Sequence, residues 1–184
     1  MLDCVVFGKV AGGKAAKFAK KSVTPETDES LLQSTLGREQ KRVEVLQHGN
    51  GTEEPTALRD DVRLILTQKV GMFRSGTDLE DALKQIRKLR ERFIRLRPIN
   101  VDKVFNLDLI RTFETEAMLE LAEIITASAL ARKESRGAHV RLDFPQRDDQ
   151  RFLKHTLAQY APAGPKLGYS NVKITRYQPE ARKY

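Results

Sequence analysis

The densest group of polar side chains in this sequence lies at residues 131–139, which read Ala-Arg-Lys-Glu-Ser-Arg-Gly-Ala-His. Further charged groups follow at Asp143 and at 147–149, Arg-Asp-Asp. Cations in the last turn of a helix stabilise the negative end of its dipole, and a glycine just beyond the helix can adopt the left-handed conformation. Helix termination therefore explains the cations and Gly137 of this run.

A helix cap does not require Glu134, Ser135, Arg136 and His139 together. Such a concentration of groups can also hold a neighbouring domain through charge-assisted hydrogen bonds. Arginine suits this role because its planar guanidinium presents five donors. The residues alone leave two interpretations open, a helix cap and a clasp between domains.

Other candidate chemistries are weakly supported. The three histidines, His48, His139 and His155, lie far apart and lack metal-ligand spacing, so no metal site is predicted. The glycine-containing run at 8–14 is one residue short of a phosphate-binding loop and follows no long strand. Cys4 sits in an apolar run without a nearby base, which predicts a buried, inert thiol. We therefore assign no catalytic residue.

The composition suits one domain, or one domain plus an arm. The 184 residues include 33 Lys and Arg against 25 Asp and Glu, for a net charge of +8. A single cysteine excludes an internal disulfide framework, and no apolar window is long enough for a membrane span or a cleaved leader. The basic excess could attract nucleic acid, but both signs of charge are interspersed and no aromatic cluster offers a stacking platform.

Hydrophobic periodicity predicts helices along most of the chain. The first, at 2–19, has small residues at Gly8, Gly12 and Ala16, a stripe that another backbone or a flat ligand could approach closely. Adjacent glycines cost roughly 1 kcal/mol each in a helix, so this helix should depend on its packing partner; the alternative is a frayed terminus. A polar helix follows at 26–47, with a predicted cap at Thr24-Pro25.

Three further helices carry apolar stripes, at 56–73, at 77–96 and at 107–133. The second should begin with a capping box at Thr77 and Glu80, and the third with Asn106 as its cap. Short connections favour an up-down-up bundle. Its third helix should face its neighbours with one stripe of Ile110, Phe113, Ala117, Leu121, Ile124 and Ser128. Met118, Ala122, Ile125 and Ala129 lie beside this stripe, so the face should be wide enough to contact two neighbours. The residues that we expect at the centre of the core are Ile65, Ile86, Phe93, Phe113, Leu121 and Ile124.

The predicted fold class is therefore mainly α: a three-helix up-down-up bundle with an N-terminal helical arm and an extended or short β tail. The domain boundaries follow from these elements. Residues 1–21 form the arm, 22–55 a polar helix and linker, 56–139 the bundle, and 140–184 the tail. Within the tail, two short strands or extended arms are expected at 155–160 and 167–176.

At the polar run, the sequence resembles the C-terminal part of the succinate dehydrogenase and fumarate reductase flavoprotein subunit. The resemblance rests on 129–139, 143–145, 147–149, 152–157 and the ending Arg-Lys-Tyr. Residues 1–8 are similar to the run that opens the last helix of that family's FAD-binding domain, and 72–74 and 104–109 match in the same order. The resemblance covers essentially the whole chain, and Glu-Ser-Arg-Gly-Ala-His is highly specific.

The resemblance implies a fragment of an FAD-dependent oxidoreductase that interconverts succinate and fumarate. Residues 1–21 would be the last helix of a truncated FAD-binding domain, and the catalytic residues would lie upstream of Met1. Met1 itself stands where the family commonly has leucine. FAD would belong to the parent subunit, with none held by this segment alone. The segment's own role would be to brace the FAD domain and contribute to complex assembly.

The implied sites are two. Backbone groups of Met1 and Leu2 would approach the flavin, where free amides at a helix N-terminus stabilise negative charge. The cluster of Glu134, Ser135, Arg136 and His139 would make the interdomain contact.

The implied partners are the FAD-binding and capping domains of the parent and the iron–sulfur subunit. The resemblance also implies a cytoplasmic location, peripheral to the inner membrane through the assembled complex, without membrane insertion or nucleic acid. The alternative is a free-standing basic helical interaction module that binds an acidic protein or nucleic acid.

Overall fold

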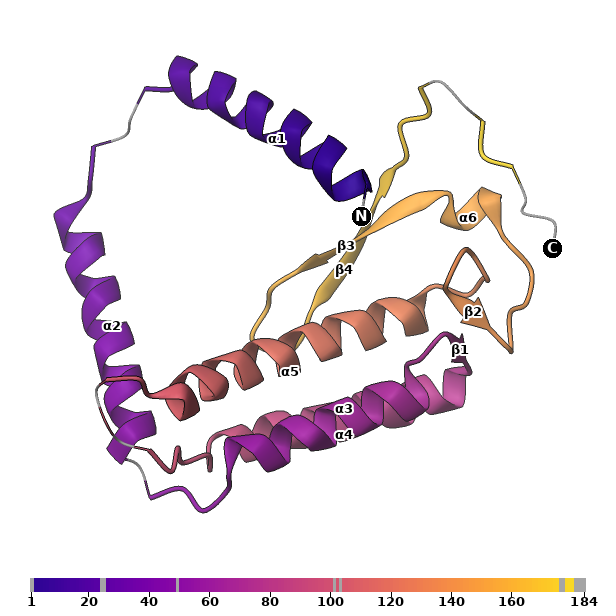
Figure 1. Ribbon diagram of the computed structural model, residues 1–184. Coiled ribbons are helices and arrows are strands. Elements are labelled where there is room, and N and C mark those ends of the chain that lie inside the picture. Colours follow the sequence, from indigo (N-terminus) through magenta and orange to yellow (C-terminus); the bar gives the residue numbers. More distant parts are fainter. Residues whose placement is uncertain are drawn as a thin grey trace. The chain divides into compact units, whose positions relative to one another are not determined.

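The computed structural model describes residues 2–23, 26–48, 50–100, 102, 104–175 and 178–180. Helices dominate this part of the chain, which confirms the predicted mainly α class (Figure 1). The helices are α1 (Leu2–Lys21), α2 (Glu29–His48), α3 (Pro55–Lys69), α4 (Gly76–Phe93), α5 (Leu107–Ala131) and α6 (Asp149–Phe152). The strands are β1 (Phe73–Arg74), β2 (Val140–Arg141), β3 (Lys154–Gln159) and β4 (Lys166–Asn171).

The chain divides into two compact units, Met1–Arg42 and Val43–Tyr184. In the first unit α1 buries none of its residues. A side chain added at Gly8 or Gly12 would meet no atom within 4 Å, so the small-residue stripe has no partner within its own unit. Cys4 is exposed, and the predicted burial of its thiol is wrong because α1 has no apolar partner within its unit.

The helix α2 begins at Glu29, three residues later than predicted. The carboxylate of Asp28 accepts hydrogen bonds from the amides of Ser30 (3.0 Å) and Leu31 (3.1 Å), and this side-chain cap fixes the start. The predicted cap at Thr24-Pro25 lies outside the described residues. Of the whole helix only Leu46 is buried, in agreement with its polar sequence.

The core of the second unit lies between α3, α4 and α5, each of which contacts the other two. Apolar side chains from all three helices meet there, and burial of this apolar surface supplies the main stabilising free energy. The buried core consists of Leu58, Val62, Ile65, Val70, Leu79, Ala82, Ile86, Leu89, Leu96, Leu119, Ala122 and Ala129.

The boundaries of α3 and α4 differ from the predicted ones. The helix α3 ends at Lys69, and Phe73, predicted on its apolar stripe, is an exposed residue of β1. The cap of α4 is Ser75 rather than Thr77: its hydroxyl oxygen accepts from the amide of Asp78 at 3.1 Å. The hydroxyl in turn donates to the Asp78 carboxylate at 2.6 Å, a bond between two side chains rather than the return bond to a backbone amide that the predicted capping box would make.

The helix α5 starts as predicted, but its buried face matches the predicted one only in part, at Ala122 and Ala129. The Asn106 side chain accepts from the amide of Leu109 at 2.9 Å, which confirms the cap. Leu121, however, is 57% exposed and Ile110 is 53% exposed. The buried residues are instead Thr112, Thr115, Leu119, Ala122, Glu123, Thr126 and Ala129.

Threonine can occupy this face because each buried hydroxyl finds an acceptor within the helix. Thr112, Thr115 and Thr126 donate to the carbonyl oxygens four residues earlier, at 2.7–2.8 Å. A satisfied hydroxyl costs little to bury. Of the residues predicted at the centre of the core, two are buried, three are half-buried and one is exposed. The buried ones are Ile65 and Ile86, the half-buried ones are Phe93, Phe113 and Ile124, and the exposed one is Leu121.

The strands form two small sheets. The strand β1 pairs in parallel with β2, with Phe73 opposite Val140. The strands β3 and β4 form an antiparallel hairpin, which confirms extended structure in the tail, although β4 ends at Asn171. Among the described helices, none combines the length and the apolar composition needed to cross a membrane.

Candidate functional site

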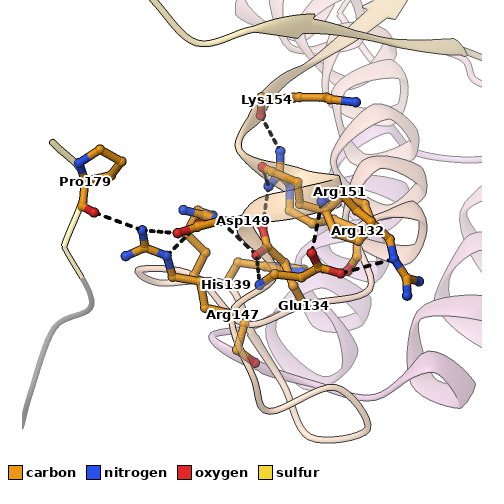
Figure 2. A network of polar contacts seen from close by, with 12 residues as sticks. Arg132, Glu134, His139, Arg147, Asp149, Arg151, Lys154 and Pro179 are labelled. Atoms are coloured by element: carbon orange, nitrogen blue, oxygen red, sulfur yellow. Dashed lines mark hydrogen bonds and ion pairs between the residues drawn. The ribbon is translucent and has the colours of Figure 1, made fainter. Parts of the chain in front are cut away.

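The polar run folds into a compact network directly after the end of α5 (Figure 2). It occupies the connection that leads from α5 through β2 to α6. We call this network the polar corner, and its residues are Arg132, Glu134, Ser135, Arg136, His139, Arg141, Asp143, Arg147 and Asp149.

Glu134 is the centre of the polar corner, with no exposed surface. Its carboxylate accepts from Arg132 at 2.5 Å, from the Nε and Nη2 atoms of Arg136 at 2.9 and 3.0 Å, and from the backbone amide of Asp148 at 2.8 Å. Burial by itself raises the pKa of Glu134, but these donors outweigh burial and hold the pKa below the usual 4.5. Glu134 is therefore a buried carboxylate that stays ionised at neutral pH.

Arg136 joins the buried carboxylate to the surface. Besides Glu134 it binds Asp149 at 2.6 Å, and its hydrogen bond to Glu134 is the largest of the effects that raise the pKa of Arg136. Asp149 also accepts two hydrogen bonds from Arg147, and these bonds lower the pKa of Asp149. Arg147 then donates to the carbonyl oxygen of Glu180 at 2.7 Å, so the chain of ion pairs reaches the tail of the protein.

Arg141 caps α5, a role that the sequence interpretation gave to nearer cations. Its Nη1 atom donates to the carbonyl oxygens of Ala129, Leu130 and Arg132 at 2.9–3.2 Å, and its side chain is almost fully buried. Asp143 pairs with the same guanidinium, and that hydrogen bond lowers the pKa of Asp143 to about 2. Arg141 was missed because it lies ten residues beyond the helix, where periodicity carries no signal.

The neighbouring turn fixes the path of the chain. Gly137 has a positive φ of 57°, which confirms the predicted left-handed conformation. It lies in the turn between Arg136 and His139, whereas α5 ends at Ala131, so its predicted role in helix termination is wrong. The Ser135 hydroxyl contacts the carbonyl of Phe144 at 2.9 Å and the amide of Arg141 at 2.9 Å. Asp143 also accepts from the amide of Gly76 at 3.0 Å, and a side chain at Gly76 would lie only 2.8 Å from that carboxylate. The polar corner is thus fastened to the start of α4.

His139 lies half-buried between β1 and the end of α5. Its Nδ1 atom is 2.8 Å from Nη1 of Arg74, and its Nε2 atom is 3.1 Å from the carbonyl oxygen of Arg132. Burial is the main cause that lowers the pKa of His139 below 6.5, and the nearby cations of Arg74, Arg141 and Arg132 add to it.

The geometry favours a positioning role for the polar corner rather than catalysis. Its carboxylates, Glu134, Asp143 and Asp149, are all engaged with arginines. In the part of the chain that the structure describes, no group of His, Cys, Asp and Glu side chains could hold a metal ion. What the arrangement can do is hold one surface of the protein in a fixed shape.

The structure brings together the four residues of the predicted interdomain contact, Glu134, Ser135, Arg136 and His139. Each of them is engaged with groups of the same unit. Of the two predicted flavin contacts, Met1 lies outside the described residues. Leu2 opens α1 in the first unit, where its side chain is exposed.

Comparison with known families finds one family match that covers most of the chain. The family model for the C-terminal region of fumarate reductase flavoproteins matches residues 59–184. The fumarate reductase flavoprotein subunit of Haemophilus influenzae is 39% identical over 189 aligned positions, and that of Escherichia coli K12 is 37% identical over 187. Both alignments cover 100% of this chain and 31% of the relative.

Solved structures give the same result. A variant of the quinol fumarate reductase FrdA of E. coli matches with a TM-score of 0.87 and 37% identity, covering 96% of this chain and 30% of the other. A Mycobacterium smegmatis Sdh1 complex matches with a TM-score of 0.76 at 23% identity over 91% of this chain and 28% of the other, a likeness of fold alone. The chain spans less than a third of the length of these relatives, and the matches favour a segment of a larger flavoprotein over a free-standing module.

Proposed function

Since the chain belongs to the family of fumarate reductase flavoprotein C-terminal domains, we propose that it is the helical C-terminal portion of an FAD-dependent enzyme that interconverts succinate and fumarate. The observation that carries this proposal is the alignment of the whole chain with the fumarate reductase flavoprotein subunit of H. influenzae. The enzyme activity is that of the parent subunit, and this segment alone is inactive.

The role of the segment within the parent is structural. The ion pairs of the polar corner lock the connection after α5 to the start of α4 and to α6, and the fixed surface braces the FAD-binding and capping domains. Support comes from Glu134, which is fully buried, and from Arg136, whose side chain keeps 27% of its surface exposed at the edge of the network. Glu134, Ser135, Arg136 and His139 thus shape the interdomain contact.

The first unit packs against the part of the parent that binds the flavin. The helix α1 exposes Leu2, Val5, Phe7 and Val10 on a helix whose glycines have open space beside them. An apolar helix of this kind is stable when it is enclosed by another domain, and its N-terminal amides suit an electron-rich ring. Met1 and Leu2 therefore approach the flavin, while FAD itself is held by the rest of the parent.

In the complete enzyme the flavoprotein assembles with an iron–sulfur subunit and lies on the cytoplasmic side of the inner membrane, without inserting into it. The relatives with solved structures support such an assembly, because one of them is described as quinol-fumarate reductase with menaquinol molecules.

A chimera tests the proposal. The segment of the E. coli fumarate reductase flavoprotein that aligns with this chain is replaced by the full 184-residue chain, and a second protein lacks that segment altogether. We expect the chimera to retain FAD and to reduce fumarate with a reduced viologen dye, and the truncated protein to do neither. A folded chimera that holds no flavin and has no activity would contradict the proposal.

Two further measurements separate the role of the segment from that of the parent. The isolated chain, mixed with FAD and succinate, should neither retain flavin through gel filtration nor reduce a dye. The substitution Arg136→Lys should lower the unfolding temperature of the isolated chain and, in the chimera, cause an additional loss of flavin. If the substitution lowers the unfolding temperature of both proteins by the same amount and the chimera keeps its flavin, Arg136 has no part in the interdomain contact.

A further inference from the structure

His139 occupies a position where three chain segments meet. Arg74 reaches it from β1, the carbonyl group of Arg132 faces it from the end of α5, and Arg141 follows it on β2. His139 also closes its own turn, since its backbone amide and carbonyl both bond to Arg136 at 2.8–3.0 Å. Figure 2 shows the ring inside the polar corner.

The two contacts of the ring define its protonation state. A guanidinium group has only donors, so Nδ1 must accept the hydrogen bond from Arg74 with its lone pair. A carbonyl oxygen has only lone pairs, so Nε2 must carry the hydrogen that it shares with Arg132. Only the neutral imidazole with its proton on Nε2 satisfies both contacts.

The charges around the ring make a second proton unfavourable. The guanidinium of Arg132 is paired with Glu134, and that of Arg141 with Asp143. Arg74 differs, because its hydrogen bonds go to the carbonyl of Gly71 and to His139. No carboxylate lies within ion-pair distance of Arg74 among the described residues. A proton on Nδ1 would therefore set two N–H groups and two positive charges against each other.

Two backbone hydrogen bonds depend on this junction. The amide of Leu142 donates to the carbonyl oxygen of Arg74 at 2.8 Å, and the amide of Val140 donates to that of Met72 at 3.2 Å. These bonds flank the parallel pairing of β1 with β2, which is only two residues long. Displacing Arg74 would remove the side-chain contact between β1 and His139, the residue that precedes β2.

We propose that His139 is a proton-sensitive link: neutral, it ties β1 to the end of α5, and its protonation releases Arg74 and opens the pairing of β1 with β2. The polar corner then responds to acid through one side chain, while its carboxylate pairs remain intact. The direction of the pKa shift agrees, because burial and three cations keep His139 neutral in the folded protein.

The sign of the pH effect follows from linkage. A histidine in the opened or unfolded chain binds a proton near pH 6.5, whereas the folded site resists it. The link therefore contributes fully above that pH and is lost as the pH falls below it. Between pH 7.5 and 5.5 the equilibrium constant for opening should rise about tenfold if the closed site stays neutral.

The first experiment uses the full 184-residue chain labelled with ¹⁵N. At pH 7.5 long-range NMR spectra of the imidazole nitrogens should show His139 as the Nε2–H tautomer. Hydrogen exchange at the amides of Val140 and Leu142, corrected for intrinsic rates, should accelerate about tenfold between pH 7.5 and 5.5. The other tautomer, or unchanged protection, would overturn the proposal.

The second experiment uses His139→Gln, because a glutamine amide can accept from Arg74 and donate to Arg132 but cannot titrate. This variant should keep its protection at pH 7.5 and lose the acid response. His155→Gln is the matched control, since His155 is an exposed histidine on β3. It should respond to acid as the unaltered chain does.

If His139→Gln does not fold, Arg74→Gln provides an independent test. Glutamine can still donate to Nδ1 but carries no charge, so protonation of His139 becomes less costly and the acid response should shrink. An undiminished response in His139→Gln or in Arg74→Gln, or a response abolished by His155→Gln, would show that another group senses the proton.

Discussion

The helices α1 and α5 show how weakly the composition of a helix determines its burial. The helix α1 carries Val5, Val6 and Phe7 in a row, and all three are more than half exposed. The helix α5 buries Thr112 and Thr126 completely. The two helices differ in their neighbours, because α5 contacts both α3 and α4 whereas α1 buries no residue in its own unit.

This difference indicates that partners, more than local sequence, set the stability of each part. For α5 the partners are apolar side chains along its length and arginine-bound carboxylates at its end. For α1 the proposed partner is the rest of the parent flavoprotein. Substitutions that affect partners should therefore cost more than substitutions that affect only a local helix signal.

The largest effect should come from Leu119→Ala compared with Leu121→Ala. Leu119 is 1% exposed, and its truncation should lower the free energy of unfolding by about 3 kcal/mol, within the range for buried leucines. Leu121 is two residues away and mostly exposed, so its truncation should cost less than about 1 kcal/mol. Urea denaturation measures both, and equal losses would mean that α5 buries both faces.

Glu134→Gln should rank second, with a loss of about 2–3 kcal/mol, since removing one member of a buried ion pair leaves its partners unsatisfied. The loss should be smaller than for arginines left wholly unpaired, because Arg132 and Arg136 keep other hydrogen-bond acceptors. The lowered pKa of Glu134 means that its contribution is complete above pH 4.5 and is lost as the pH falls.

The variant should therefore lose less stability than the unaltered chain when the pH drops from 6 to 3. Thermal unfolding at several pH values measures this difference. If the unfolding temperatures of the two proteins fall in parallel with pH, Glu134 is not a source of acid sensitivity.

A smaller effect is expected at the start of α4. Ser75→Ala removes the hydroxyl that accepts from the amide of Asp78 and should cost about 1 kcal/mol. Thr77→Ala is the matched control, because Thr77 lies at the position where the sequence suggested the cap, and it should cost less. If the threonine variant unfolds at lower urea than the serine variant, the assignment of the cap is wrong.

The smallest effect on the second unit should come from Gly12→Ala. Alanine favours a helix over glycine by about 1 kcal/mol, and nothing lies within 4 Å of the added methyl group. Circular dichroism should show increased helicity at low temperature, while the unfolding midpoint of the core should not change. A lowered midpoint would mean that α1 has a partner within this chain.

The positions of the helices could be predicted well from the sequence, whereas the residues that each helix buries could be predicted less well. Asn106 and Gly137 were predicted correctly because caps and left-handed turns depend on one residue type at one position. The main stripe of α5 was assigned to residues such as Ile110 and Leu121, because periodicity is read from large apolar residues, and only Ala122 and Ala129 of the second stripe are buried. Periodicity does not show that threonine hydroxyls can donate to carbonyl oxygens of the same helix, which allows threonines to occupy the buried face.

The polar corner was recognised as a cluster but not as a network. Glu134, Ser135, Arg136 and His139 are close in sequence, so their proximity could be predicted. Their partners, including Arg74 and Asp149, come from other segments, and pairing across the chain leaves no local pattern. Arg141 illustrates the limit, since a buried arginine on a strand looks like a surface residue in sequence.

The short parallel pairing of β1 with β2 also bears on how this protein folds. The whole of α4 and α5 lies between the two strands, so the contact of β1 with β2 closes a long loop but pairs only two residues of each strand. Closing such a loop costs entropy that local helix formation does not require. The three helices should therefore associate first, and the strand pair should form in the last step, after the helix ends have already brought Phe73 and Val140 together.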